Sequence, residues 1–192
     1  MRASGIRLDA DHYCAAIEIR FLSMEILPTI VQDFRTLKGL ADKAIAQVRD
    51  RDLHWQPDKE SNSIAVIMKH ISGNMISRWT DFLTSDGEKP NRNRDAEFED
   101  DQVSREELLK RWEAGWDCLF RAFDVLSESD IEKTVYIRAE PYTVLKAITW
   151  QVRHYSYHIG QIVYIAKHLR SEEWKNLSTP RGKSGDYLRR GP

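Results

Sequence analysis

Apolar residues recur at three- and four-residue steps in several long segments of this chain, which is the spacing of an amphipathic α-helix. The segments with this spacing are about 28–49, 63–83, 105–126 and 141–170. Pro28 and Pro141 stand at the start of the first and the last segment, where the missing N–H of a proline would be unpaired anyway. Amphipathic helices of this number and length predict an all-α protein and, more closely, a four-helix bundle.

The segment between the second and third predicted helices is long for a connection in a compact domain. Residues 84–103 include Gly87 and Pro90, which favour a loop. Such a loop can cross the end of the bundle, and the second and third helices could then run parallel. Directly after it, Ser104 and Glu107 have the spacing of a capping box and predict the start of the third helix.

Two stretches do not follow the helical pattern. Residues 133–138 alternate in polarity like a short strand, and no partner strand is evident, so this stretch either pairs locally or stays extended. Residues 1–27 lack a clean apolar stripe, and we treat them as an N-terminal extension. Residues 28–192 are then predicted to be a single domain that ends in a polar tail.

Composition and charge narrow the class of protein. With 41% hydrophobic and 31% charged residues, the chain is typical of a soluble globular protein. Its 29 basic and 30 acidic residues leave a net charge of -1, so we expect neither nucleic acid nor a membrane as a partner. No apolar run approaches the roughly 20 residues of a membrane span, and the start has no apolar core of a signal peptide. Cys14 and Cys118 form no Cys-x-x-Cys motif, so we expect a cytoplasmic protein with free thiols.

Histidines supply the candidate chemistry. His154 and His158 lie four residues apart and therefore on one face of the last predicted helix. His70 lies at the edge of the apolar stripe of the second helix, where it can point between packed helices. We predict that these three side chains bind one divalent metal ion and leave a fourth position open, as in catalytic zinc sites. We expect zinc or nickel, with iron, cobalt or manganese as alternatives. Neutral imidazoles leave the charge of the ion in place, which lowers the pKa of bound water and favours an anionic ligand such as a thiolate.

Structural alternatives stand beside each of these assignments. A histidine pair at this spacing is, without context, more often structural than metal-binding, and His70 is the residue that favours a metal. Gln161, Asn74 and Arg78 could support the histidines or contact a substrate. Each of the three also has a structural explanation, and Arg78 could bind an anion or extend along apolar surface to solvent. The histidines expected to be structural or solvated are His12, His54 and His168.

The motif His-x3-His-x-Gly-Gln, formed by His154, His158, Gly160 and Gln161, resembles the DinB/YfiT-like superfamily when it is combined with His70. Further stretches resemble one bacterial subfamily of that group, a domain of unknown function: 62–65, 70–74, 78–83, 86–90 and 177–184. The resemblance covers about residues 28–184.

This resemblance implies a four-helix bundle of up-down-down-up topology with a histidine-based site for a divalent metal. It implies His70, His154 and His158 as the metal triad. Related bundles include thiol S-transferases that use bacillithiol, mycothiol-dependent isomerases and proteins associated with DNA-damage induction.

Two functional hypotheses follow. The first is a metal-dependent transferase, or a related enzyme of hydrolase type, that acts on a small thiol-bearing substrate. The alternative is a non-catalytic, metal-stabilised stress-response or binding module, in which Asp81 or a group from a partner chain would close the metal site. A homodimer is compatible with both.

Overall fold

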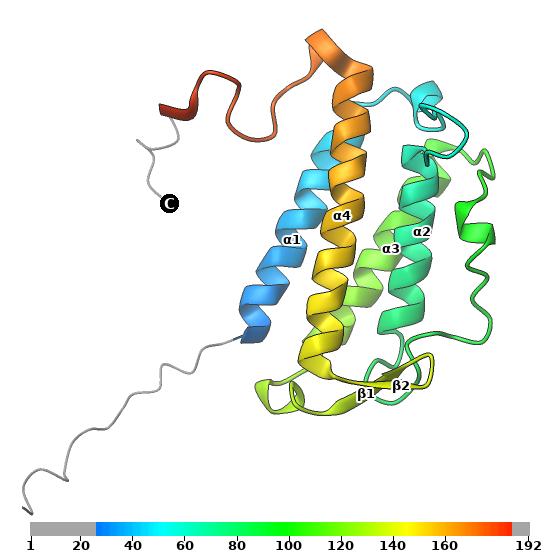
Figure 1. The fold of residues 1–192 in the computed structure, drawn as a ribbon, viewed down its shortest axis with the longest axis vertical. Helices are drawn as coiled ribbons and strands as arrows, with labels where there is room; N and C mark the ends of the chain where they lie inside the picture. Colours follow the sequence, from blue (N-terminus) through cyan, green and yellow to red (C-terminus); the bar gives the residue numbers. More distant parts are fainter. Residues whose placement is uncertain (1–25, 186–192) are drawn as a thin grey trace, which may run out of the picture.

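The computed structural model describes residues 26–185, and in that part of the chain the architecture is mainly helical (Figure 1). Four long helices lie side by side, and a small antiparallel sheet closes one end. The elements are α1 (Ile26–Ile45), α2 (Ile64–Trp79), α3 (Arg105–Asp124), β1 (Thr134–Ile137), β2 (Glu140–Thr143) and α4 (Val144–Arg170). The prediction of four helices is therefore confirmed. The extension predicted at 1–27 lies outside the described residues, apart from its last two, which begin α1.

The helices begin at capping residues and end at breaks in the backbone. The side chains of Ser63, Ser104 and Thr143 each accept a hydrogen bond from a backbone N–H in the first turn of α2, α3 and α4, respectively. The first three predicted helices are slightly too long at their ends, whereas α4 ends at residue 170 as predicted. Helix α1 stops at residue 45 instead of 49 and α3 at 124 instead of 126. Helix α2 stops at 79 instead of 83, because Asp81 adopts a positive φ of 49° that no helix can continue.

The sheet corrects one prediction. The expected strand at 133–138 is β1, and its partner is β2, which lies where Pro141 was predicted to open the last helix. Pro141 instead pairs with Tyr136 in the hairpin, a position that a two-stranded sheet tolerates because its outer edge needs no N–H. Arg138 and Ala139 form the two-residue turn with φ values of 57° and 61°, which matches a type I′ hairpin. Helix α4 therefore begins at Val144, three residues later than predicted.

The long connection 80–104 runs along the outside of the bundle, beside α2 (Figure 1). Near its start, the backbone N–H of Gly87 donates to the carbonyl of Tyr136 in β1 over 2.8 Å. Near its end, Lys69 Nζ on α2 donates to the carbonyl of Glu99 over 2.9 Å. Between these anchors a short 3-10 helix, Ala96–Phe98, packs against α2. The connection thus brings two of its own side chains, Glu97 and Phe98, to the helix that carries His70.

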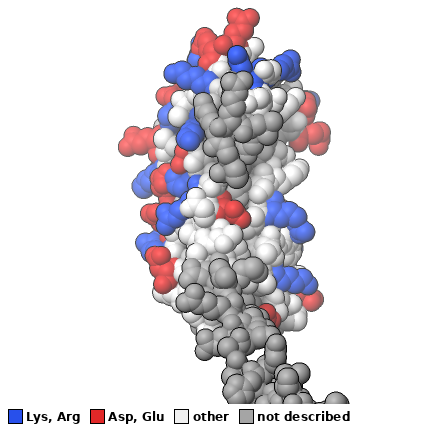
Figure 2. Space-filling model, turned by 90° about the vertical axis from the view of Figure 1, so that its left-hand side faces the viewer, with Lys and Arg blue, Asp and Glu red and all other residues white. Residues whose placement is uncertain are grey.

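Charged residues of both signs are spread over the described surface. On the face shown in Figure 2, basic and acidic side chains are interspersed, which agrees with the net charge of -1. None of the described helices combines the length and apolar character that a membrane crossing requires.

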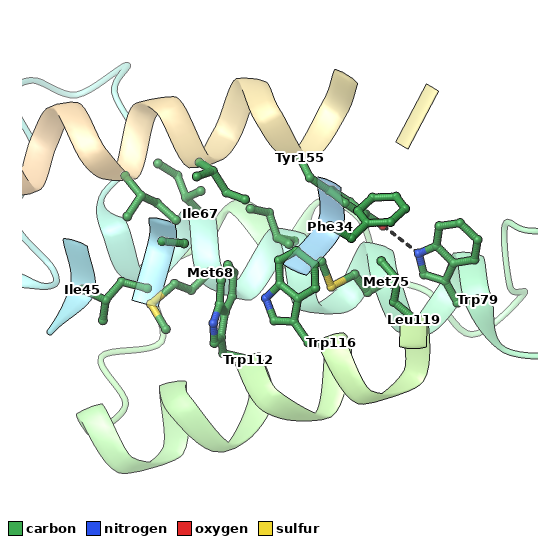
Figure 3. Close-up of a cluster of buried hydrophobic side chains, with 14 of the residues drawn as sticks. Phe34, Ile45, Ile67, Met68, Met75, Trp79, Trp112, Trp116, Leu119 and Tyr155 are labelled. Carbon is green, nitrogen blue, oxygen red and sulfur yellow. Dashed lines mark hydrogen bonds between the residues drawn. The ribbon is translucent and has the colours of Figure 1, made fainter. Parts of the chain in front are cut away.

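All four helices contribute large side chains to one core (Figure 3). Phe34 of α1 is fully buried, and its ring packs edge-on against Trp79 of α2 at a centroid distance of 6.1 Å. Trp116 of α3 and Tyr155 of α4 meet at 6.1 Å in the same region. Trp79 Nε1 donates to the Tyr155 hydroxyl over 3.1 Å, so the polar tip of this tyrosine is satisfied inside the core. This packing fixes α4 against α2 directly beside the histidines.

Candidate metal centre

Three histidines from two helices meet at the side of this core. His70 comes from α2, and His154 and His158 come from successive turns of α4. Their candidate ligand atoms all lie within 4.8 Å of one another. His70 Nε2 and His154 Nε2 are 3.2 Å apart. Two nitrogens bound to one zinc ion in a tetrahedral site are about 3.3 Å apart, given Zn–N distances near 2.0–2.1 Å. The cluster therefore has the dimensions of a site that could hold a metal ion.

Glu97 fixes the orientation of His70. Its carboxylate accepts from His70 Nδ1 over 2.9 Å, so the free Nε2 faces the other two histidines. Arg92 holds the same carboxylate with two hydrogen bonds of 2.7 Å each. Burial alone would raise the pKa of Glu97, but the bonds from Arg92 and His70 hold this pKa below its ordinary value. Glu97 is therefore a buried anion that compensates part of the charge a metal would bring.

Gln161 has the same role for His158. Its side-chain oxygen accepts from His158 Nδ1 over 2.8 Å, because the two residues lie one turn apart on α4. This contact leaves Nε2 of His158 free for the cluster. Gln161 thus lies where the sequence placed it, beside the histidine pair.

Two aromatic rings pack against the imidazoles of His70 and His158. Phe98 of the connection stacks on His70 with ring centroids 4.5 Å apart, and Tyr157 packs edge-on against His158 at 5.0 Å. Sequence reasoning missed Glu97, Arg92 and Phe98. They lie in an irregular connection without apolar periodicity, and the only signal was the length of that connection.

The two histidines of α4, His154 and His158, favour the neutral form of the imidazole. Burial, and after it the repulsion from the neighbouring His158 and His70, together lower the pKa of His154 to about 3. Burial also lowers the pKa of His158, partly offset by its hydrogen bond with Gln161. Neutral imidazole is the form that binds metal ions. The site is therefore ready for a metal at neutral pH without losing a proton from these two rings.

The other predicted residues lie further along the helices. Asn74 has its side-chain hydrogen bond with Tyr155, whose hydroxyl donates to the Asn74 oxygen over 3.0 Å. Arg78 is buried, and its Nε and Nη1 have no hydrogen-bond partner among the described residues. His54 pairs with Asp100 over 2.8 Å, as expected of a structural histidine.

No fourth described histidine, cysteine or acidic residue joins the cluster. Asp81, the residue considered for closing the site, follows the end of α2 and lies about 16 Å along the helix axis from His70, given the helical rise. Cys118 is on α3, beside Thr80. The donor set in the described residues is therefore three imidazoles, which suits a divalent transition metal with one coordination position left for another ligand.

A pocket of about 640 Å³ lies beside Gln161, the hydrogen-bond partner of His158. Gln161 belongs to its wall, so the residue that supports His158 also faces this space. The rest of the lining includes four aromatic side chains: Trp55, Tyr157, Tyr164 and His168. The dimensions suit a small organic molecule.

Comparison with known proteins gives a family. A search of curated proteins found no significant match to the chain. A family model described as a protein of unknown function, DUF1572, matches residues 22–183. This match spans all four helices, the hairpin and the histidine cluster, and the chain therefore belongs to the DUF1572 family.

Proposed function

We propose that the protein binds one divalent metal ion at His70, His154 and His158 and is a metal-dependent transferase, or a related enzyme, for a small thiol-bearing substrate. The observation that carries this proposal is a cluster of three imidazoles, one of which, His158, is hydrogen-bonded to Gln161 in the wall of a pocket. Zinc or nickel is the proposed ion, because imidazole nitrogen suits both. When bound, this ion would stabilise a thiolate by its positive charge.

Other residues of the chain would orient the histidines and contact the substrate. Glu97 and Gln161 hold the Nδ1 protons of His70 and His158, which keeps each Nε2 available. Tyr157, Tyr164 and Trp55 would hold the rest of the substrate by apolar contact, since they line the adjoining pocket. Phe98 would shield the His70 ring from water.

The DinB-like arrangement forms part of the same proposal. Arg105 at the start of α3 reaches the carbonyl of Val48, just after α1. His70 and Asn74 on α2 face residues of α4 in opposite chain directions. These contacts support an up-down-down-up order of the helices, with the connection 80–104 as the crossover.

Metal content is the first test. We expect about one zinc or nickel ion per chain in the purified wild type and a large loss in His154→Ala, because one of three ligands is gone. His168→Ala is the matched control, since His168 is exposed on the same helix and outside the cluster. Equal metal content in wild type and His154→Ala would contradict the site.

Turnover separates the enzyme from a metal-stabilised module. The assay follows consumption of free thiol with an electrophile, with and without added metal. Metal-dependent consumption that His154→Ala abolishes supports the enzyme. Bound metal without turnover, together with a large fall in melting temperature after chelation, favours the non-catalytic stress-response or binding module.

A further inference from the structure

The pocket beside Gln161 is lined mainly by α4 and by the connection between α1 and α2, residues 46–63. The lining side chains of α4 follow one another at steps of three and four residues and therefore share one face of the helix: Tyr157, Gln161, Tyr164 and His168. Trp55 comes from the connection, and its ring stacks on that of His168 with centroids 5.4 Å apart. This contact joins the two sides of the pocket.

Two aromatic side chains of this pocket are largely exposed. The exposed fraction of Tyr157 is 64% and that of Tyr164 is 75%. Both rings line the pocket, so most of their surface is available to a ligand and is not used by the core. The face of an aromatic ring carries a partial negative charge and attracts a cation placed over it.

The charge of the lining has the same preference. Glu60 is the only Asp, Glu, Lys or Arg side chain among the described residues that line the pocket. Its backbone N–H donates to Asp58 over 2.9 Å, but its carboxylate has no hydrogen-bond or ion-pair partner in the described part of the chain. A carboxylate without a basic neighbour in the lining attracts a positively charged ligand and repels an anion.

Gly160 leaves space in the same wall. It lies inside α4 between Tyr157 and Tyr164, where glycine weakens a helix relative to alanine. A Cβ atom at this position would have no neighbour within 4 Å, so close packing does not require the glycine. The missing side chain enlarges the pocket between the two tyrosines, which favours a ligand that occupies this space.

We propose that this pocket binds an alkylated ammonium group, and that the thiol substrate of the metal site carries this group at its other end. The rings of Trp55 and Tyr164 would contact the cation, and Glu60 would neutralise it. Tyr164 lies six residues after His158, which is about 9 Å along the helix axis, so several bonds would separate the ammonium group from the thiol. The inference rests on the function proposed above, but binding of the ammonium group itself needs neither metal nor thiol.

The test uses the full chain and two probes. One is choline, and the other is its neutral carbon analogue, in which a tert-butyl group replaces the trimethylammonium group. At constant ionic strength, we expect a saturable rise in melting temperature with choline and roughly tenfold weaker binding of the analogue. Equal affinity for the two probes would overturn the proposal. No response to choline would also overturn it, including the case in which a second copy of the chain covers the tyrosines.

Variants at exposed positions assign the selectivity to the pocket. Glu60→Gln removes the charge and Tyr164→Leu removes a ring while keeping an apolar side chain, so each should weaken choline binding several-fold and leave the binding of the neutral analogue nearly unchanged. Glu172→Gln and Tyr136→Leu, at exposed positions outside the pocket, are the matched controls and should bind choline like the wild type. Wild-type choline affinity in both pocket variants would overturn the proposal.

A substitution at Gly160 separates binding from folding. Gly160→Leu should fill the space between the tyrosines and abolish the choline response. It should also raise the melting temperature without ligand, because leucine favours a helix more than glycine does. Gly39→Leu in α1 is the matched control, since a Cβ atom there also has no neighbour within 4 Å. This control should melt higher and still respond to choline. An unchanged choline response in Gly160→Leu would overturn the proposal.

The metal site is tested separately from this pocket. The choline response should persist in His154→Ala, because the ammonium group contacts no metal ligand. A loss of metal with a retained choline response therefore supports the pocket whatever the fate of the thiol chemistry. Normal metal content without any choline response would overturn the inference and leave the metal site standing.

Discussion

Glu97 determines which nitrogen of His70 faces the cluster. It accepts from Nδ1 while Arg92 holds it in place, so the carboxylate can turn away only if it leaves Arg92 as well. Carboxylates that support metal-binding histidines typically contribute 10- to 100-fold to metal affinity, roughly. An acidic residue outside the metal cluster thus has a measurable role in it.

We expect Glu97→Gln to weaken metal binding by about 10- to 100-fold, because the amide carries no charge and competes poorly for the Nδ1 proton. The measurement is the metal dissociation constant in competition with a chelator. Glu99→Gln is the matched control, since Glu99 is exposed two residues away and its hydrogen bond with α2 comes from its backbone carbonyl. An unchanged dissociation constant in Glu97→Gln would show that His70 needs no anionic partner.

Individual residues differ in how far the sequence predicts them. His154, His158 and Gln161 share one helical face, so their spacing alone places them together. His70 needed the apolar stripe of α2 as a second indication. Glu97 was not predictable, because its position depends on how a connection without periodicity folds back on α2. The sequence also did not predict that Arg78 lacks hydrogen-bond partners for its Nε and Nη1 among the described residues, since several acidic residues lie near it in the sequence.

The helices and strands show where local signals compete. The periodicity predicts all four helices, and Ser104 predicts the start of α3 as observed. The predicted start of the last helix at Pro141 was wrong, because a proline suits the first turn of a helix and also the outer edge of a hairpin. The pairing of β1 with β2 decided between them, and this pairing depends on a turn at Arg138 and Ala139 that carries no glycine or asparagine signal.

This turn gives a prediction at Ala139, where φ is 61°. Glycine adopts positive φ without the steric penalty that alanine carries, so Ala139→Gly should raise the free energy of unfolding by about 1 kcal/mol. Urea unfolding measures the change. The same substitution at Ala114, exposed inside α3, should lower it by about 1 kcal/mol. Equal signs for the two variants would contradict the strained turn.

For the molecule as a whole, folding buries histidine side chains that are exposed to water in the unfolded chain. The ordinary pKa of histidine is 6.5, and the folded protein holds that of His154 at about 3. Between these values the unfolded chain binds more protons than the folded one. The free energy of unfolding of the metal-free protein therefore falls as the pH falls below about 6.5.

We expect a loss of about 1–2 kcal/mol between about pH 7 and about pH 5 from His154, with His158 adding to it. Glu97 does not contribute in this range, because its unfolded-state pKa lies near 4.5 and its stabilising effect is lost only below that value. Urea unfolding at several pH values measures the slope. His154→Gln should show a shallower slope, and a slope equal to that of wild type would contradict the assignment.

Gly73 shows how empty space can matter as much as a functional group. A Cβ atom there would lie 2.6 Å from Glu97 Oε1, and the carboxylate cannot withdraw while Arg92 and His70 hold it. Helix α2 gives up about 1 kcal/mol of intrinsic helical stability to keep a glycine at this residue. In a library of random variants, residue 73 would therefore behave like a member of the metal site, although its side chain is a single hydrogen atom.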